Sequence, residues 1–465
     1  MDKPMLTDLD RASAGDLAQA LVNREVSAVE LVDAAIARIE ARDRAINAVV
    51  VRDFDRAVAA AKMADAALAR GERGALLGVP MTVKESHAIA GLPMTWGSEG
   101  FRGFVSESDS VGVARLKSGG AVILGKTNVP PFLGDWQSAN PIYGRTNNPW
   151  DLDRTPGGSS GGSAAALASG MVPLEFGSDI GGSIRVPAAF CGVYGHKPTF
   201  GVIPMRGHSP PDHDGGGGGP LPLAVVGPLA RTAADLDLAL DVLAGPDEPD
   251  AKAYRLTLPP ARKSRLSDFR ILILDRHPAA DTEAEVTEAI GELGTKLARL
   301  GAVVRDTDAL TPDLAKSHDV FLAILSTALS RGAPGASPPN AHEWMGLLDA
   351  QVQMRRSWGR LFGEYDVVLA PNYGITAFPH DANPDQGARK QIINGRTTPY
   401  MSQVAWPGLA LVSNLPATAA PIGLSKNGLP LSVQIIGGYL EDRTTIGFAG
   451  LLEQEFGGFQ PPPGY

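Results

Sequence analysis

The chain has 465 residues, with 42 Lys and Arg against 51 Asp and Glu, so its formal net charge is −9. This acidic balance, with only 20% charged residues, argues against a broad basic surface for DNA or RNA. The 44% share of apolar residues excludes disorder throughout and is enough for a large buried core. Glycine and proline are frequent, at 54 and 37 residues, so we expect many turns and functional loops.

Targeting signals and disulfides are not expected. Residues 1–16 mix charged and polar side chains and contain no apolar stretch typical of a secretory signal. No apolar run is long enough to cross a bilayer. The single cysteine, Cys191, cannot form an intrachain disulfide, and its small and apolar neighbours favour a buried thiol. These features predict a cytoplasmic protein with no membrane segment.

Helical patterns dominate the first 75 residues and then give way to alternation. Ser27 and Glu30 form a capping box before apolar residues at helical spacing, and residues 55–70 are also helical in pattern. Further on, short apolar runs at 79–84, 121–126, 271–275 and 366–371 alternate with helical stretches at 109–118, 232–244, 282–300 and 441–455. Short continuous apolar runs suit strands buried between helices, so the pattern predicts an α/β fold.

We expect one domain over residues 1–465, with a variable smaller subdomain at 246–365 inside it. Residues 208–222 hold five consecutive glycines and four prolines, which support neither a helix nor a paired strand. We therefore expect a mobile loop at 208–220 that overhangs the functional site and gates bulky ligands. The polar side chains of this loop do not match zinc-ligand spacing, so we expect them to be solvated and to bind no metal. They are His208, Asp212, His213 and Asp214.

Two short motifs suggest competing functions. Residues 120–127 match the phosphate-binding loop of nucleotide-binding proteins, which needs a strand before it and a helix after it. Here a helical stretch precedes the motif and residues 121–124 themselves resemble a strand, so a nucleotide-binding module is a weak alternative. Residues 157–161 match the nucleophile elbow of α/β-hydrolases, but no strand precedes them, and His380 has no compelling partner.

A third pattern covers nearly the whole chain. Lys84 ends an apolar run, TPGGSSGGSAAALASG follows at 155–170, and DIGGSIRVPAAF follows at 179–190. These segments, with GAVILGKTNVP, GRTNNPWD and LPLSVQIIGGYLEDRTTI, resemble the amidase signature family of hydrolases. The resemblance implies an α/β/α sandwich in which helices cover a twisted, mixed and mainly parallel central sheet.

The same resemblance assigns roles to three residues. It implies that Ser183 is the nucleophile, that Ser159 shuttles its proton, and that Lys84 is the base. It also implies a cis peptide bond between Gly158 and Ser159. A serine hydroxyl needs a base to become nucleophilic, and burial can lower a lysine pKa by roughly 3 to 5 units. A neutral Lys84 at the end of an apolar strand is therefore a chemically suitable base.

The residues around the nucleophile carry further expectations. We expect Asp179 and Arg185 to pair across the turn as scaffolding. Backbone N–H groups at the start of the following helical segment are expected to form an oxyanion hole. Its donors would be Ile180, Gly181, Gly182 and Ser183. The substrate pocket is expected to include Trp136, Gln137 and Met94, together with Trp96.

The resemblance implies hydrolysis of an amide-type C–N bond, in an amide, aryl amide or carbamate, through a Ser183 acyl-enzyme. It implies no metal and no cofactor. The expected partner is a small-molecule substrate, with no nucleic acid or membrane, and the chain is expected to be a monomer or homodimer. The alternative within the same fold is the A-type subunit of a glutamine-dependent amidotransferase, which hands ammonia to a partner acting on charged tRNA.

Overall fold

The computed structural model describes residues 12–211, 221–330 and 335–465. The glycine run and the side chains of Asp212, His213 and Asp214 lie outside these ranges. The predictions of a mobile, gating loop and of solvated side chains therefore stay predictions for those residues.

One central sheet crosses the described part of the chain, and its eleven strands follow the order β1-β3-β2-β6-β8-β7-β14-β15-β11-β9-β10. β2, β3 and β6 are buried along their whole length, which matches the continuous apolar runs in the sequence. The strands are β1 (Val49–Arg52), β2 (Pro80–Lys84), β3 (Val122–Thr127), β6 (Leu174–Asp179), β7 (Tyr194–Lys197), β8 (Val225–Ala230), β9 (Arg270–Ile273), β10 (Val303–Arg305), β11 (Val367–Ala370), β14 (Ala417–Leu424) and β15 (Pro430–Ile436).

The predicted α/β class with a large mixed sheet and covering helices is confirmed. Parallel pairing, expected to predominate, joins β2 to β3 and β6 on one flank and β9 to β10 and β11 on the other. The strands between these flanks pair antiparallel. One cause is local, since β14 and β15 are joined by a short turn, and a hairpin can only be antiparallel.

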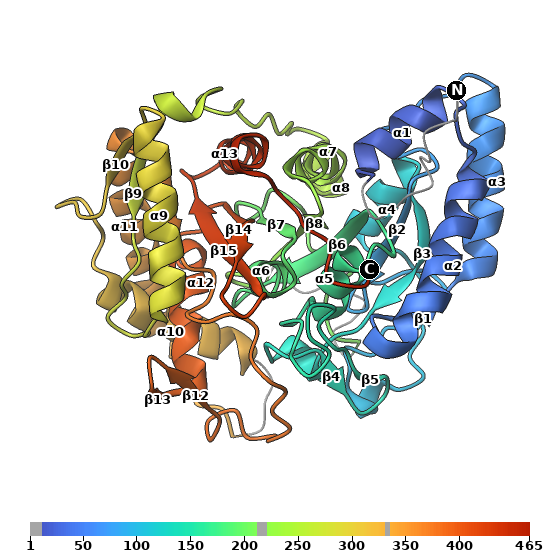
Figure 1. The fold of residues 1–465 in the computed structure, drawn as a ribbon. Helices are drawn as coiled ribbons and strands as arrows, with labels where there is room; N and C mark the ends of the chain where they lie inside the picture. The colour runs from blue at the N-terminus through green and yellow to red at the C-terminus, as the bar shows by residue number, and fades with distance from the viewer. Residues whose placement is uncertain (1–11, 212–220, 331–334) are drawn as a thin grey trace.

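Helices flank the sheet and close both ends of the molecule (Figure 1). α1 (Ala14–Val22), α2 (Ala28–Ile46) and α3 (Phe54–Ala69) lie at one end, and α9 (Ala284–Arg299), α10 (Leu314–Leu329) and α11 (Ala341–Glu364) lie at the other. α7 (Ala233–Leu243) packs against α13 (Asp442–Phe456). The remaining α-helices are α4 (Val111–Ser118), α5 (Gly161–Ala168), α6 (Arg185–Cys191), α8 (Glu248–Ala251) and α12 (Ala405–Leu411). The two hairpins outside the sheet pair β4 (Ala139–Asn140) with β5 (Gly144–Arg145) and β12 (Lys390–Ile393) with β13 (Arg396–Pro399).

Local sequence signals explain where several elements begin and end. The predicted capping box forms at α2, where Ser27 Oγ accepts from the Glu30 amide at 3.1 Å and the Glu30 carboxylate accepts from the Ser27 amide at 2.8 Å. α4 ends before Gly120, whose φ of +94° suits glycine, and β3 starts two residues later. Lys126 and Thr127 lie inside that buried strand, and the next α-helix begins only at Gly161, so the nucleotide-binding alternative at 120–127 is wrong.

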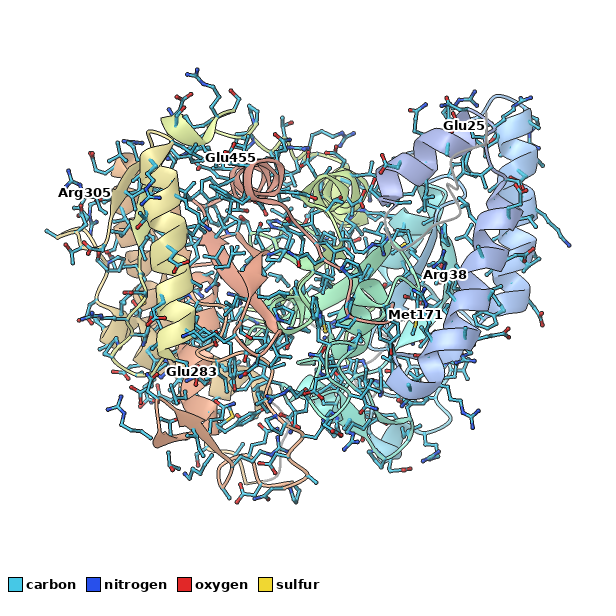
Figure 2. The ribbon with its side chains drawn as sticks, viewed as in Figure 1. Glu25, Arg38, Met171, Glu283, Arg305 and Glu455 are labelled. Carbon is cyan, nitrogen blue, oxygen red and sulfur yellow. The ribbon has the colours of Figure 1, made fainter. Side chains whose placement is uncertain are left out.

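Burial separates the interior from a polar surface. Glu25, Arg305 and Glu455 are exposed, whereas Met171 is fully buried (Figure 2). The largest buried cluster packs α2, α3, α5 and α7 against the sheet, and a second one surrounds Phe190 and Tyr373. Among the helices of the described residues, none has the length and apolar character that a membrane span requires.

Candidate active site

The candidate site lies where two parallel neighbouring strands end. β2 ends at Lys84 and β6 ends at Asp179, and their parallel pairing brings both carboxyl ends to the same edge of the sheet. This edge is the usual position of ligand sites in sheets with parallel strands. The fold therefore places the two strand ends that the sequence pattern singled out next to each other.

Lys84 is fully buried and faces two serine hydroxyls. Its Nζ lies 2.7 Å from Ser159 Oγ and 2.9 Å from Ser178 Oγ, in hydrogen-bonding geometry. Burial lowers the pKa of Lys84 to about 7, although the negative charges of Asp179 and Glu175 oppose this change. A large fraction of Lys84 is therefore neutral near pH 7, and its lone pair can accept a proton from Ser159.

Ser159 is held in place by its backbone and by its neighbours. The peptide bond between Gly158 and Ser159 is cis, as expected. A Cβ on Gly158 would lie 2.4 Å from the Asp135 carbonyl oxygen, so only glycine fits there. The next amide, that of Ser160, donates to the Ser183 carbonyl at 3.1 Å. The segment that carries Ser159 is thus hydrogen bonded directly to the segment that carries Ser183.

Ser183 lies in the turn between β6 and α6 and is 6% exposed. Within the residues that the structure describes, its hydroxyl has no hydrogen-bond partner. The preceding Gly182 has a φ of +96°, and a Cβ there would lie 2.8 Å from Val186 and 3.0 Å from Pro407. This close packing fixes the turn and leaves the Ser183 hydroxyl available to a ligand.

Of the four amides expected to form an oxyanion hole, one is already hydrogen bonded within the structure. The Gly182 N–H donates to Asp179 Oδ1 at 2.8 Å, so it is already paired and is not a free donor. The amides of Ile180, Gly181 and Ser183 have no acceptor among the described residues. Three of the four expected donors are therefore free. The fourth is paired because the Asp179 carboxylate turns inward and accepts its hydrogen bond.

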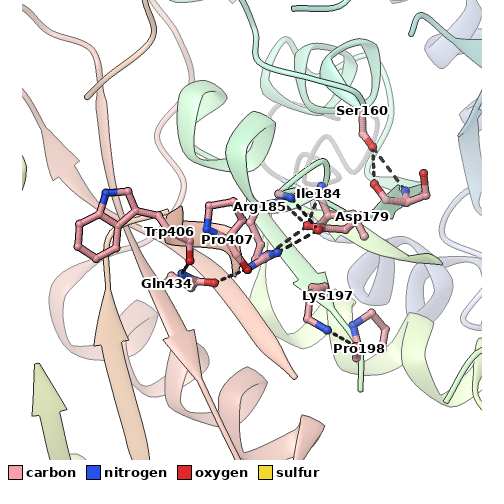
Figure 3. Close-up of polar contacts among 12 residues, drawn as sticks. Ser160, Asp179, Ile184, Arg185, Lys197, Pro198, Trp406, Pro407 and Gln434 are labelled. Atoms are coloured by element: carbon pink, nitrogen blue, oxygen red, sulfur yellow. Dashed lines mark hydrogen bonds and ion pairs between the residues drawn. The ribbon is translucent and has the colours of Figure 1, made fainter. Parts of the chain in front are cut away.

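The predicted pair of Asp179 and Arg185 is confirmed, with 2.9 Å between Arg185 Nη2 and Asp179 Oδ1 and no exposure of either side chain. Arg185 also donates to the Pro407 carbonyl at 3.0 Å and to the Gln434 side chain (Figure 3). Burial acts to raise the pKa of Asp179, but the Arg185 guanidinium, together with Lys197 and the Gly182 amide, outweighs it and holds that pKa below its usual value. An ionised Asp179 thus anchors the turn that carries Ser183.

Arg185→Leu is expected to destabilise the fold by about 3 to 5 kcal/mol, because it leaves the Asp179 carboxylate buried without its cation. Urea denaturation followed by circular dichroism measures this change. Arg265→Leu is the matched control, since Arg265 pairs with Asp268 at the surface, and its denaturation midpoint should match that of the unmodified chain. Equal midpoints for both variants would contradict an anchoring role for Arg185.

The four expected pocket residues have different positions. Trp136 is buried beside the turn that carries Ser183, and its Nε1 donates to the Gly181 carbonyl at 2.9 Å. Gln137 uses both atoms of its amide on the backbone of Asp381, at 2.9 Å each, and so braces that segment. Met94 packs in a small cluster with Trp96. Trp136 is thus hydrogen bonded to the turn that carries Ser183.

The sequence pattern misses the role of one residue near Lys84 and mispredicts the burial of another. The sequence pattern does not single out Ser178, although it precedes Asp179 on a strand next to β2 and could have been found from that register. The expectation that His208 is solvated is wrong, because it is only 8% exposed and its Nε2 lies 2.9 Å from Ser86 Oγ. Local sequence does not reveal this contact, because it joins residues 122 positions apart. No group of three potential metal-ligating side chains occurs within the described ranges.

The fold and the sequence of this chain match a known class of hydrolases. The family model described as Amidase matches residues 30–338 and 316–446. The chain therefore belongs to the amidase signature family, whose enzymes hydrolyse amide C–N bonds.

Particular relatives carry the names of different activities. The chain is 30% identical to fatty-acid amide hydrolase 2-A of Danio rerio, over 99% of this chain and 91% of that protein. It is 32% identical to the A-type subunit of the glutamyl-tRNA(Gln) amidotransferase of Methylococcus capsulatus, over 96% and 97% of the two chains. The crystal structure of a bacterial aryl acylamidase superposes with a TM-score of 0.79 at 28% identity, covering 95% of this chain and 96% of that one.

Proposed function

We propose that this chain hydrolyses the C–N bond of linear amides, including aryl amides and carbamates, through a covalent acyl-enzyme on Ser183. In this proposal Lys84 is the base and Ser159 carries protons between Lys84 and Ser183. The observation that carries the proposal is the 2.7 Å contact between the Nζ of fully buried Lys84 and Ser159 Oγ. The names of the hydrolase relatives, for fatty-acid amides and aryl acylamides, support the same bond type.

The first half-reaction forms the acyl-enzyme. Neutral Lys84 accepts the Ser159 proton while Ser159 takes the proton of Ser183, whose oxygen attacks the substrate carbonyl carbon. The resulting oxyanion accepts hydrogen bonds from the free amides of Ile180, Gly181 and Ser183. When the C–N bond breaks, the proton returns from Lys84 through Ser159 to the leaving nitrogen. An amine leaves and the acyl group stays on Ser183.

The second half-reaction frees the enzyme. A water molecule gives its proton to Ser159, with Lys84 again accepting the Ser159 proton, and the hydroxide attacks the acyl carbon. The proton then returns through Ser159 to Ser183 Oγ as the ester bond breaks and a carboxylic acid leaves. No net proton or electron is gained by the protein in the cycle.

Ser159→Ala is expected to lower kcat/KM for an anilide by about 10²- to 10⁴-fold without loss of folding, because proton transfer of this kind contributes that range. Phenyl esters should lose less, since phenolate leaves without being protonated. Steady-state kinetics on matched acetanilide and phenyl acetate measure both effects. Ser160→Ala is the matched control, because the Ser160 hydroxyl lies near Ser178 and does not contact Lys84. Equal losses for ester and amide would contradict the shuttle role.

A second candidate is the A-type subunit of a glutamine-dependent amidotransferase, favoured by the relatives of that name. It shares the bond type but requires L-glutamine as substrate and a partner that receives ammonia. A panel of anilides, carbamates, esters and L-glutamine, assayed with the chain purified alone, separates the two. Anilide kcat/KM above that of L-glutamine supports the proposed amidase, and the reverse order supports the amidotransferase component.

A further inference from the structure

Ring side chains gather directly after the strand that carries Lys84. The His87 amide donates to the Lys84 carbonyl at 3.1 Å, so His87 lies one turn beyond the lysine. The His208 ring centre is 4.6 Å from that of His87 and 5.1 Å from that of Trp96. We name His87, Trp96 and His208 the ring cluster. It is formed by three segments that are separate in the sequence, and it adjoins the proposed base.

Each ring of this cluster has a nitrogen without a partner. His87, Trp96 and His208 are 1%, 7% and 8% exposed, and His87 Nδ1, Trp96 Nε1 and His208 Nδ1 are buried with no hydrogen bond among the described residues. Most buried polar atoms in folded proteins are paired, so three unpaired nitrogens in one cluster indicate a place for a hydrogen-bonding ligand.

The chemistry of two of these nitrogens is fixed. The indole Nε1 of Trp96 can only donate. His87 Nε2 lies 3.3 Å from the Gly177 carbonyl, which can only accept, so Nε2 carries the proton. Burial holds the pKa of His87 well below its ordinary value, so the ring is neutral and Nδ1 has a free lone pair. The ring cluster thus offers one donor and one acceptor, and no charge on either ring.

The backbone around Trp96 is held in an uncommon conformation. Trp96 has a φ of +51°, and its amide donates to the Glu85 carboxylate at 3.0 Å. The Trp96 carbonyl accepts from the amide of Phe132, which, like Leu133, also has a positive φ, of +52° and +60° respectively. Left-handed backbone is uncommon for bulky residues and is concentrated at ligand sites. The surrounding structure therefore fixes the Trp96 ring against His208.

The same tryptophan belongs to a small apolar cluster with less buried neighbours. Trp96 packs with Met94, and Phe101 and Leu133 adjoin this small cluster. Phe132 is 54% exposed, and its ring lies 5.9 Å from that of Phe101. The order from Lys84 outward is therefore first neutral polar rings and then an apolar rim that ends in an exposed aromatic side chain.

We propose that the ring cluster binds the amine portion of the substrate, and that it selects uncharged aromatic amines bearing a group that both donates and accepts hydrogen bonds. This inference rests on the proposed function. There the proton reaches the leaving nitrogen from Lys84 through Ser159, which places the amine portion on the Lys84 side. An amide or carbamate group pairs with the free donor of Trp96 and the free acceptor of His87. A carboxylate would find no cation among these rings.

The test compares two acetanilides that differ only in the para group, acetamido against isopropyl, in the unmodified chain and in Trp96→Phe. The variant keeps a ring but loses the donor, and the ratio of kcat/KM, acetamido over isopropyl, is expected to fall about 10-fold. Trp358→Phe is the matched control, because Trp358 is also buried with an unpartnered Nε1 but lies in α11, and its ratio should not change. A second variant, His87→Leu, removes the free acceptor without altering the residue at 96 and should also lower the ratio.

A reciprocal series locates the subsite. 4-Nitroanilides of acetic, 4-acetamidobenzoic and 4-isopropylbenzoic acids vary the acyl portion, and their relative kcat/KM values should be the same in Trp96→Phe as in the unmodified chain. A change confined to this acyl series would overturn the inference, and so would unchanged ratios for both variants in the first series. The proposed function would still stand in either case if the unmodified chain turns over amides and a sulfonyl fluoride labels Ser183. Absence of both turnover and labelling in the unmodified chain would overturn the two together.

Discussion

Ser183→Ala is expected to lower amide turnover by about 10⁴-fold or more, because removal of the nucleophile abolishes the covalent route. The fold should be unchanged, since the Ser183 hydroxyl has no hydrogen-bond partner among the described residues, whereas its carbonyl, which the variant keeps, holds the Ser160 amide. Anilide kinetics and thermal melting measure the two effects.

The control for this variant is Cys191→Ala. Cys191 is the only thiol in the chain and is fully buried, and burial raises its pKa far above the usual range, so it is not a thiolate near pH 7. Turnover should therefore persist in Cys191→Ala. Loss of turnover in Cys191→Ala, together with retained turnover in Ser183→Ala, would show that Ser183 is not the nucleophile.

Lys84 determines the second large effect, through pH. If neutral Lys84 is the base, kcat/KM should rise tenfold per pH unit in acid, level off above a pKa of about 7, and stay high in mild alkali. The direction follows from the cause: burial favours the neutral amine, which is the active form and gains population as pH rises. Initial rates from pH 5 to pH 9.5 measure the profile. Activity that falls through neutral pH would contradict this role.

Lys84→Arg distinguishes a role of Lys84 as proton acceptor from a role of its positive charge. Arginine stays protonated at every accessible pH, so it keeps the cation and removes the proton acceptor. We expect a loss of about 10³-fold or more, with no recovery in alkali. Activity close to that of the unmodified chain in this variant, across the same pH range, would show that Lys84 acts through its charge alone.

The sequence was informative wherever one residue type at one position determined the outcome. The apolar run ending in Lys84 predicted a buried strand with a lysine at its end, and β2 confirms it. The resemblance implied the cis peptide bond before Ser159, which the structure contains. The pair of Asp179 and Arg185 also formed as expected, because the two residues are separated by one tight turn.

Contacts between distant segments were not predictable in this way. His208 was expected in solvent, yet it packs on His87 and Trp96, because three segments converge after β2. Composition alone indicated a loop there, and it carries no information on what the loop touches. The inward turn of Asp179, which pairs the Gly182 amide, likewise depends on side-chain geometry that spacing does not encode.

The central claim is that the acyl group of the substrate becomes bound to Ser183. Acid quenching during turnover of a 4-nitrophenyl ester, followed by proteolysis and mass spectrometry, tests it most directly. We expect the mass of the acyl group on the peptide that contains Ser183 in the unmodified chain, and on no peptide in Ser183→Ala. Acylation of Ser159, Ser160 or another residue, with Ser183 unmodified, would contradict the account.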